Sequence, residues 1–136
     1  MRHAHRKRLV PSSEILRTLK GHFPELDLTT VEWSWEVYNK IYEAEFEFEG
    51  DAYEVEITIN ADLLLVEKAI DVEDVPARII LKAESRFPDA DITEAEEIQL
   101  SNGDVFYELT LVKEDGEKFE VHYREDGVMT AQAEDL

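Results

Sequence analysis

The chain of 136 residues has no cysteine, only five glycines and four prolines, and no long apolar segment. Without cysteine it has no disulfide bond, thiol nucleophile, zinc–thiolate site or iron–sulfur cluster. Its longest purely apolar run, Leu63 to Val66, is far shorter than the roughly 20 residues of a membrane span, so we expect no membrane insertion. Basic residues are also scarce, with 14 Lys and Arg against 33 Asp and Glu and a net charge of −19. This charge argues against binding of nucleic acid or of an anionic membrane by the body of the protein.

Four of the basic side chains lie within the first eight residues, where there is no acid. Removing these four charges from the total of −19 leaves −23 on residues 9–136. We expect residues 1–9 to form a disordered basic arm on an acidic body. The arm is not followed by the apolar segment of a secretory signal, because Leu9 and Val10 lead directly to Pro11. The compartment is therefore open: periplasmic or secreted if a signal peptide was removed, and otherwise cytoplasmic.

A repeat of 64 to 65 residues organises the rest of the chain. Val10-Pro11 and Phe23-Pro24 recur as Val75-Pro76 and Phe87-Pro88. Between the members of each pair, apolar residues are spaced at i, i+1, i+4 and i+8, which places them on one stripe of an α-helix. Proline cannot continue a helix and restricts the residue before it, so each helix is expected to end at its Phe-Pro pair.

Alternation of apolar and polar residues follows each Phe-Pro pair and predicts strands with one apolar face and one solvent-facing side. The alternating segments are residues 31–37, 42–48 and 53–59 in the first copy and 105–111 and 119–123 in the second, with closing strands expected at 63–66 and 128–131. Asn102-Gly103 and Asp126-Gly127 are strong signals for hairpin turns between them. The predicted fold class is α+β: two tandem helix-plus-four-stranded antiparallel sheet repeats, with helices packed on one face of a continuous or paired sheet. We place the first repeat at residues 10–74 and the second at 75–136.

The second repeat resembles a PepSY-like domain. The segments that carry the resemblance are Val75-Pro76, Phe87-Pro88-Asp89-Ala90, Phe106-Tyr107-Glu108-Leu109, Phe119-Glu120-Val121 and Asp126-Gly127. The first repeat is similar but more divergent, with Asn60-Ala61-Asp62 where Asp126-Gly127 stands in the second. Two such units together resemble the β-lactamase-inhibitor-protein-like family. This resemblance implies a bacterial extracytoplasmic protein that modulates a peptidase or occupies a partner's cleft, and it implies no catalytic residues.

Few residues suit catalysis or metal binding. The five glycines are accounted for by helix ends and turns, so no glycine-rich phosphate loop is left. His22 and His122 are both predicted to be surface histidines. Asp89 to Thr93 alternates acids in the manner of a calcium loop, but lacks the loop's later glycine and glutamate. We therefore expect no enzymatic activity, no cofactor and no dedicated metal site.

The candidate contact residues lie on the strands of the first repeat. They are Trp33, Trp35, Glu43, Glu45, Glu47, Glu54 and Glu56. The glutamates are predicted to form a solvated row about 6.8 Å apart along a strand, with no reason for any carboxyl to keep its proton near neutrality. Two placements are open for the tryptophans: core packing under the first helix, or exposure on the open sheet face, where tryptophan is a typical contact residue.

The leading functional hypothesis is a non-enzymatic acidic binding module, a monomer or weak dimer, that binds or inhibits a protein partner through its open sheet face. Its negative potential would steer a basic partner. One alternative is an acidic nucleic-acid mimic that blocks a DNA-binding protein, because carboxylates about 7 Å apart are similar to phosphates in spacing. Another is a protein that responds to a small ligand or a metal. High acidity is also typical of proteins from saline habitats.

Overall fold

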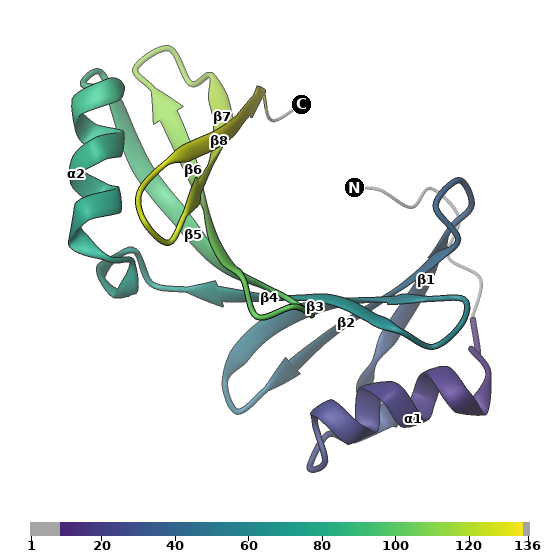
Figure 1. Ribbon diagram of the computed structural model, residues 1–136. Helices are drawn as coiled ribbons and strands as arrows, with labels where there is room; N and C mark the ends of the chain where they lie inside the picture. Colours follow the sequence, from purple (N-terminus) through teal and green to yellow (C-terminus); the bar gives the residue numbers. More distant parts are fainter. Residues whose placement is uncertain (1–8, 135–136) are drawn as a thin grey trace. The chain divides into compact units, whose positions relative to one another are not determined.

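The computed structural model describes residues 9–134. The expected basic arm lies outside the described residues, except for Leu9, which packs against the core of the first half of the chain. In chain order the elements are α1 (Ser13–His22), η1 (Leu28–Thr30), β1 (Glu32–Glu36), β2 (Ile41–Phe48), β3 (Asp51–Thr58), β4 (Leu63–Ile70), η2 (Val72–Asp74), α2 (Ala77–Arg86), β5 (Ala90–Leu100), β6 (Val105–Lys113), β7 (Lys118–Arg124) and β8 (Met129–Glu134) (Figure 1).

The predicted fold class is confirmed. Within the described residues the chain forms two α-helices and an open antiparallel sheet whose strand order, β1 to β8, is the order of the sequence. By packing, the chain divides between Glu67 and Lys68 into two compact units, called unit 1 and unit 2 below. The repeat boundary between residues 74 and 75 stays a prediction.

Both helices end where the Phe-Pro pairs predict. The α1 helix begins after Ser12, whose side-chain oxygen accepts a hydrogen bond from the Ile15 N–H, as is usual for a serine N-cap. At its end, the N–H of Phe23 donates to the carbonyl of Leu19. The α2 helix ends in the same way, with the N–H of Phe87 donating to the carbonyl of Ala83. Each helix is ten residues long, and the phenylalanine that follows it packs against the sheet.

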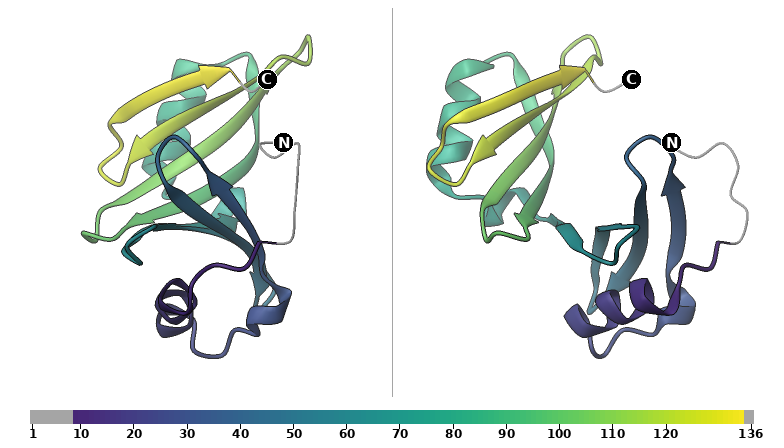
Figure 2. Two further views of the ribbon diagram at one scale, coloured as in Figure 1. Left: turned by 90° about the vertical axis from the view of Figure 1, so that its right-hand side faces the viewer. Right: turned by 45° about the vertical axis from the view of Figure 1, so that its right-hand side comes forward.

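Each unit has its own core between its helix and one face of its strands (Figure 2). In unit 1 the buried residues are Ile15, Leu19, Phe23, Leu26, Trp33, Ala44, Phe46, Val55, Ile57 and Val66. In unit 2 they are Val75, Ile79, Ala83, Ala95, Tyr107, Leu109, Leu111, Phe119, Val121 and Tyr123. The helix-ending phenylalanines contact the same strand of each unit: Phe23 meets Tyr53 of β3 edge-on at 5.1 Å between ring centroids, and Phe87 meets Phe119 of β7 edge-on at 4.9 Å. Among the described residues, no helix is both long enough and apolar enough to cross a membrane.

Successive side chains along each strand point alternately to the helix side and to the opposite side, and residues paired across two strands share a side. In unit 1, Ala44 lies opposite Val55 and both belong to the core. In unit 2, Leu109 and Val121 form the equivalent pair. These two pairs give a common reference from which positions in the two units can be matched.

We predict that Leu19→Ala lowers the free energy of unfolding of unit 1 by about 2–5 kcal/mol, because it leaves a cavity under α1. Both tryptophans lie in β1, so tryptophan fluorescence during urea denaturation reports on unit 1. Glu14 of α1 is exposed and provides the control, since Glu14→Ala is expected to change the free energy by less than about 1 kcal/mol. Equal losses for the two variants would contradict the packing of α1.

Candidate functional site

A row of glutamates lies on the side of β2 and β3 that α1 does not cover. Strand pairing sets Glu43 opposite Glu56 and Glu45 opposite Glu54. The core residues Ala44 and Val55 alternate with them and point to the other side. Together with Glu47, these four glutamates form what we call the glutamate face. These glutamates share one side because they alternate along β2 and β3 with side chains that face the core.

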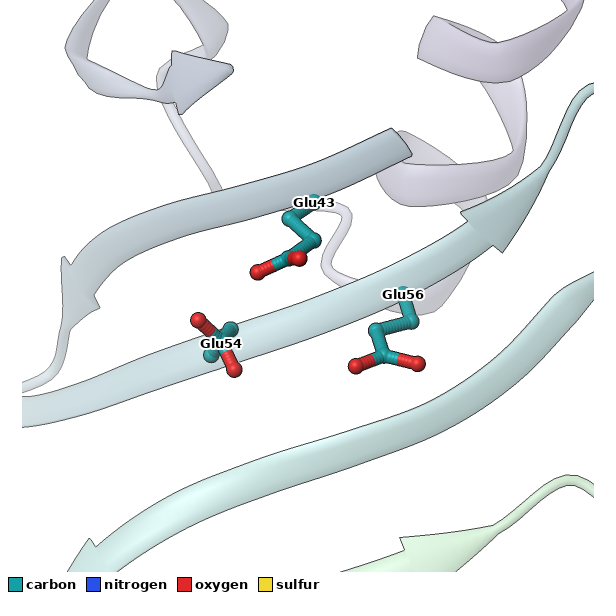
Figure 3. Close-up of side chains that lie close together, drawn as sticks. All are labelled: Glu43, Glu54 and Glu56. Carbon is teal, nitrogen blue, oxygen red and sulfur yellow. The ribbon is translucent and has the colours of Figure 1, made fainter. Parts of the chain in front are cut away.

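Three of these side chains converge instead of standing apart. Carboxylate oxygens of Glu43, Glu54 and Glu56 lie within 4.8 Å of one another, and we call this group the glutamate cluster (Figure 3). Glu43 is only 4% exposed, Glu54 and Glu56 are half-buried, and Glu47 is exposed. The expectation of a fully solvated row is therefore wrong at Glu43. Pairing of β2 with β3 brings the carboxylates of Glu54 and Glu56 close to that of Glu43.

The two tryptophans lie on the other side of β1, away from the glutamates. Trp33 is 8% exposed and belongs to the core of unit 1, so it offers almost no surface to a partner. Trp35 is half-buried and its ring lies 4.6 Å from the ring of Tyr42. Strand alternation explains both placements, because Trp33 pairs with the core residue Ala44. The predicted surface that joins these tryptophans to the glutamates is thus not formed.

An exposed aromatic residue that sequence reasoning missed lies in the turn between β1 and β2. Tyr38 is 94% exposed and follows Val37, which is also exposed. The N–H of Ile59 donates to the carbonyl of Lys40 over 3.1 Å, so the turn after β3 lies beside the turn before β2. Ile59 is exposed as well. Unit 1 therefore carries three exposed apolar side chains, Val37, Tyr38 and Ile59, at one end of its strands; we call them the apolar turn patch.

Unit 2 has a different set of residues at the positions that match the glutamate cluster. One step along from the Leu109–Val121 pair, Glu108 lies opposite His122, just as Glu43 lies opposite Glu56 in unit 1. His122 Nε2 is 2.7 Å from Glu108 Oε2. His122 was predicted to be a surface histidine, and it is in fact half-buried in this pair. Both residues alternate with core residues, a signal that places them on one side without showing that they pair.

The His122–Glu108 pair favours its charged form. The hydrogen bond with Glu108 raises the pKa of His122, with the negative charges of Glu108, Glu120 and Glu96 adding to the effect and burial opposing it. The same hydrogen bond lowers the pKa of Glu108, again against the effect of burial. When the imidazole carries its second proton, its Nε2–H donates to the carboxylate, and such charge-assisted hydrogen bonds are stronger than neutral ones.

Solved structures of three other proteins show the same fold. A DUF2874 family protein from Bacteroides ovatus ATCC 8483 has a TM-score of 0.81 at 12% sequence identity, over 93% of this chain and 89% of that chain. A DUF2874 family protein from Bacteroides uniformis ATCC 8492 has a TM-score of 0.82 at 14% identity, over 92% and 90%. A BLIP-like protein from Bacteroides fragilis NCTC 9343 has a TM-score of 0.75 at 18% identity, over 93% and 87%.

The chain shares its fold with these proteins. The predicted likeness to the β-lactamase-inhibitor-protein-like architecture is confirmed at the level of the fold by the BLIP-like protein. The resemblance of each repeat to a PepSY-like domain stays a prediction. No family model and no curated protein matches the chain.

We predict that the His122–Glu108 pair makes stability depend on pH. Folding raises the pKa of His122, so protonation of its imidazole stabilises the folded state. This contribution is complete below the pKa of the unfolded chain, near 6.5, and is lost as pH rises through the pKa of the folded protein. Folding lowers the pKa of Glu108, so ionisation of its carboxyl group also stabilises the folded state. This contribution is complete above the pKa of the unfolded chain, near 4.5, and is lost as pH falls through the pKa of the folded protein. The contribution of the pair is therefore largest between about pH 4.5 and 6.5.

Urea denaturation followed by circular dichroism at several pH values measures this dependence. His122→Gln is expected to lose less stability than the wild type as pH rises above about 6.5, the pKa of histidine in the unfolded chain. His22→Gln, which changes an exposed residue of α1, is the matched control and should retain the wild-type profile. Identical profiles for His122→Gln and the wild type would contradict the prediction.

Proposed function

We propose that this chain is a protein-binding module of the inhibitor type, and that its contact surface is formed by the glutamate face together with the apolar turn patch of unit 1. The observation that carries the proposal is the composition of this uncovered surface. The strands β1, β2 and β3 contain seven glutamates and one aspartate but no Lys, Arg or His. Such a concentration of one charge would steer a basic partner and suppress acidic ones.

Tyr38 is the residue we expect to contribute most to affinity. Tyrosine is enriched among the few residues that dominate interface energies, and a residue that is 94% exposed in the free protein has most of its surface available for burial. This role replaces the one considered for Trp33, which the core already uses. Surrounding carboxylates would then contribute mainly to orientation and association rate.

The shared fold of the BLIP-like protein supports an inhibitor-like role only as an analogy, because one fold can serve many functions. The geometry of the carboxylates disfavours the nucleic-acid-mimic alternative. A mimic needs evenly spaced negative charges, whereas the glutamate cluster brings three carboxylates within 4.8 Å. The protein-binding hypothesis makes no demand on even spacing.

We predict that Tyr38→Ala and Glu45→Lys each weaken partner binding by about tenfold or more, through lost apolar contact and reversed charge respectively. The measurement is surface plasmon resonance of the immobilised chain against a panel of β-lactamases and bacterial peptidases, at low and at physiological salt. Binding should associate faster at low salt.

Two variants of α2 are the matched controls. Leu81→Ala truncates an exposed apolar residue, as Tyr38→Ala does, and Glu84→Lys reverses the charge of an exposed acid, as Glu45→Lys does. They should leave affinity unchanged. A partner that binds Tyr38→Ala and Glu45→Lys as tightly as the wild type would contradict the proposed surface. Displacement of the chain from a DNA-binding protein by duplex DNA, with no binding to the panel, would favour the mimic instead.

A further inference from the structure

The glutamate cluster concentrates negative charge at a partly buried point of unit 1. Carboxylate oxygens from three side chains lie within 4.8 Å, and Glu43 is almost wholly buried. Like charges at this separation repel one another, and the repulsion grows as water is excluded. Each of the three carboxylates takes part in another polar or electrostatic interaction. An ionised carboxylate has about four acceptor positions, so these interactions leave room for a metal ligand bond.

The matching positions of unit 2 show how the fold balances such a charge. There, Glu108 lies opposite His122 and shares a hydrogen bond of 2.7 Å with it. In unit 1 the residue opposite Glu43 is Glu56, so a carboxylate stands where unit 2 has an imidazole that can carry positive charge. The strands β1 to β3 supply no basic side chain to take its place. At this matched position, unit 1 therefore has the carboxylate of Glu56, whereas unit 2 has the imidazole of His122, which can carry a positive charge.

Ser34 provides a second and independent observation. It lies on β1 directly opposite Glu43, so its side chain is on the side of the glutamate cluster. Ser34 is only 7% exposed, and its Oγ has no hydrogen-bond partner among the described residues. A buried hydroxyl without a partner is destabilising, and a bound water molecule, ligand or ion would supply the missing partner. The hydroxyl oxygen is a hard, neutral donor of the kind that calcium accepts.

We propose that Glu43, Glu54, Glu56 and the Oγ of Ser34 bind one calcium ion. Oxygen-only ligands suit hard cations, whereas zinc and copper prefer nitrogen and sulfur. Calcium–oxygen distances of about 2.3–2.6 Å place opposite ligand atoms about 4.6–5.2 Å apart, and those of magnesium about 4.0–4.2 Å apart. Carboxylate oxygens that lie within 4.8 Å of one another can therefore bind the same calcium ion. The ion would tie β1, β2 and β3 together, and its binding can be measured without a protein partner.

The test uses the full chain, freed of metal with a chelator and exchanged into buffer at about 0.15 M salt, where surface charges are screened. Calorimetric titration with calcium chloride should show one saturable ion per chain. Calcium in excess of its dissociation constant should raise the thermal midpoint of unit 1, followed by tryptophan fluorescence, by several degrees. Magnesium at the same concentration should bind at least tenfold more weakly.

Four variants separate this site from diffuse binding to an acidic surface. Glu56→Gln keeps the shape of the side chain and should weaken calcium binding at least tenfold. Glu47→Gln removes the same charge from an exposed position of the glutamate face, and it should change affinity less than twofold. Ser34→Ala should unfold no more easily than the wild type without calcium, yet bind calcium more weakly. Glu56→His copies the pairing of unit 2 and should abolish the calcium-dependent shift while retaining the fold.

Two results overturn the proposal. One is the absence of any saturable calcium binding and of any thermal shift in the wild type. The other is weak, multi-site binding that Glu56→Gln and Glu47→Gln reduce equally, which identifies only a counterion atmosphere.

Discussion

The two-residue period of the β-strand is the constraint on which this structure depends. In β2 and β3 every second side chain is buried under α1, so the side chains between them are directed to the opposite side. A shift of one residue in this pairing would put Glu43 under the helix and Ala44 in solvent, at a large cost in both burial and charge. The apolar residues that stabilise unit 1 therefore also position the glutamate face.

The two units share this alternation of strand residues but carry different charges at matched positions. In unit 2 a glutamate and a histidine lie opposite each other and form a charged pair. In unit 1 two glutamates occupy those places, with a third close by and a buried serine beside them. The cores are alike, because a helix stripe, a strand stripe and a helix-ending phenylalanine recur in both. At this matched pair of positions, the two units thus differ in charge on the side that the helices do not cover.

Proteins of the same fold but low sequence identity show that this fold tolerates very different sequences. Proteins that are only 12–18% identical to this chain have TM-scores of 0.75–0.82 with it. Alternating apolar residues and turns suffice to maintain such a fold, and they leave the outward-facing positions free to change. The contact surface and the calcium site proposed for this chain accordingly depend on its own glutamates, Tyr38 and Ser34.

Local patterns in the sequence determined the helices, the strands and the side on which each strand residue lies, because these depend on periods of 3.6 and 2 and on proline and glycine. The alternation alone already set the tryptophans apart from Ser34 and Glu36. Which strands pair, and in what register, was decided only by the tertiary structure, since pairing joins residues that are distant in sequence. That pairing buried Glu43, brought Glu54 and Glu56 to it, and set Glu108 against His122. Helix packing likewise committed Trp33 to the core and left Tyr38 exposed.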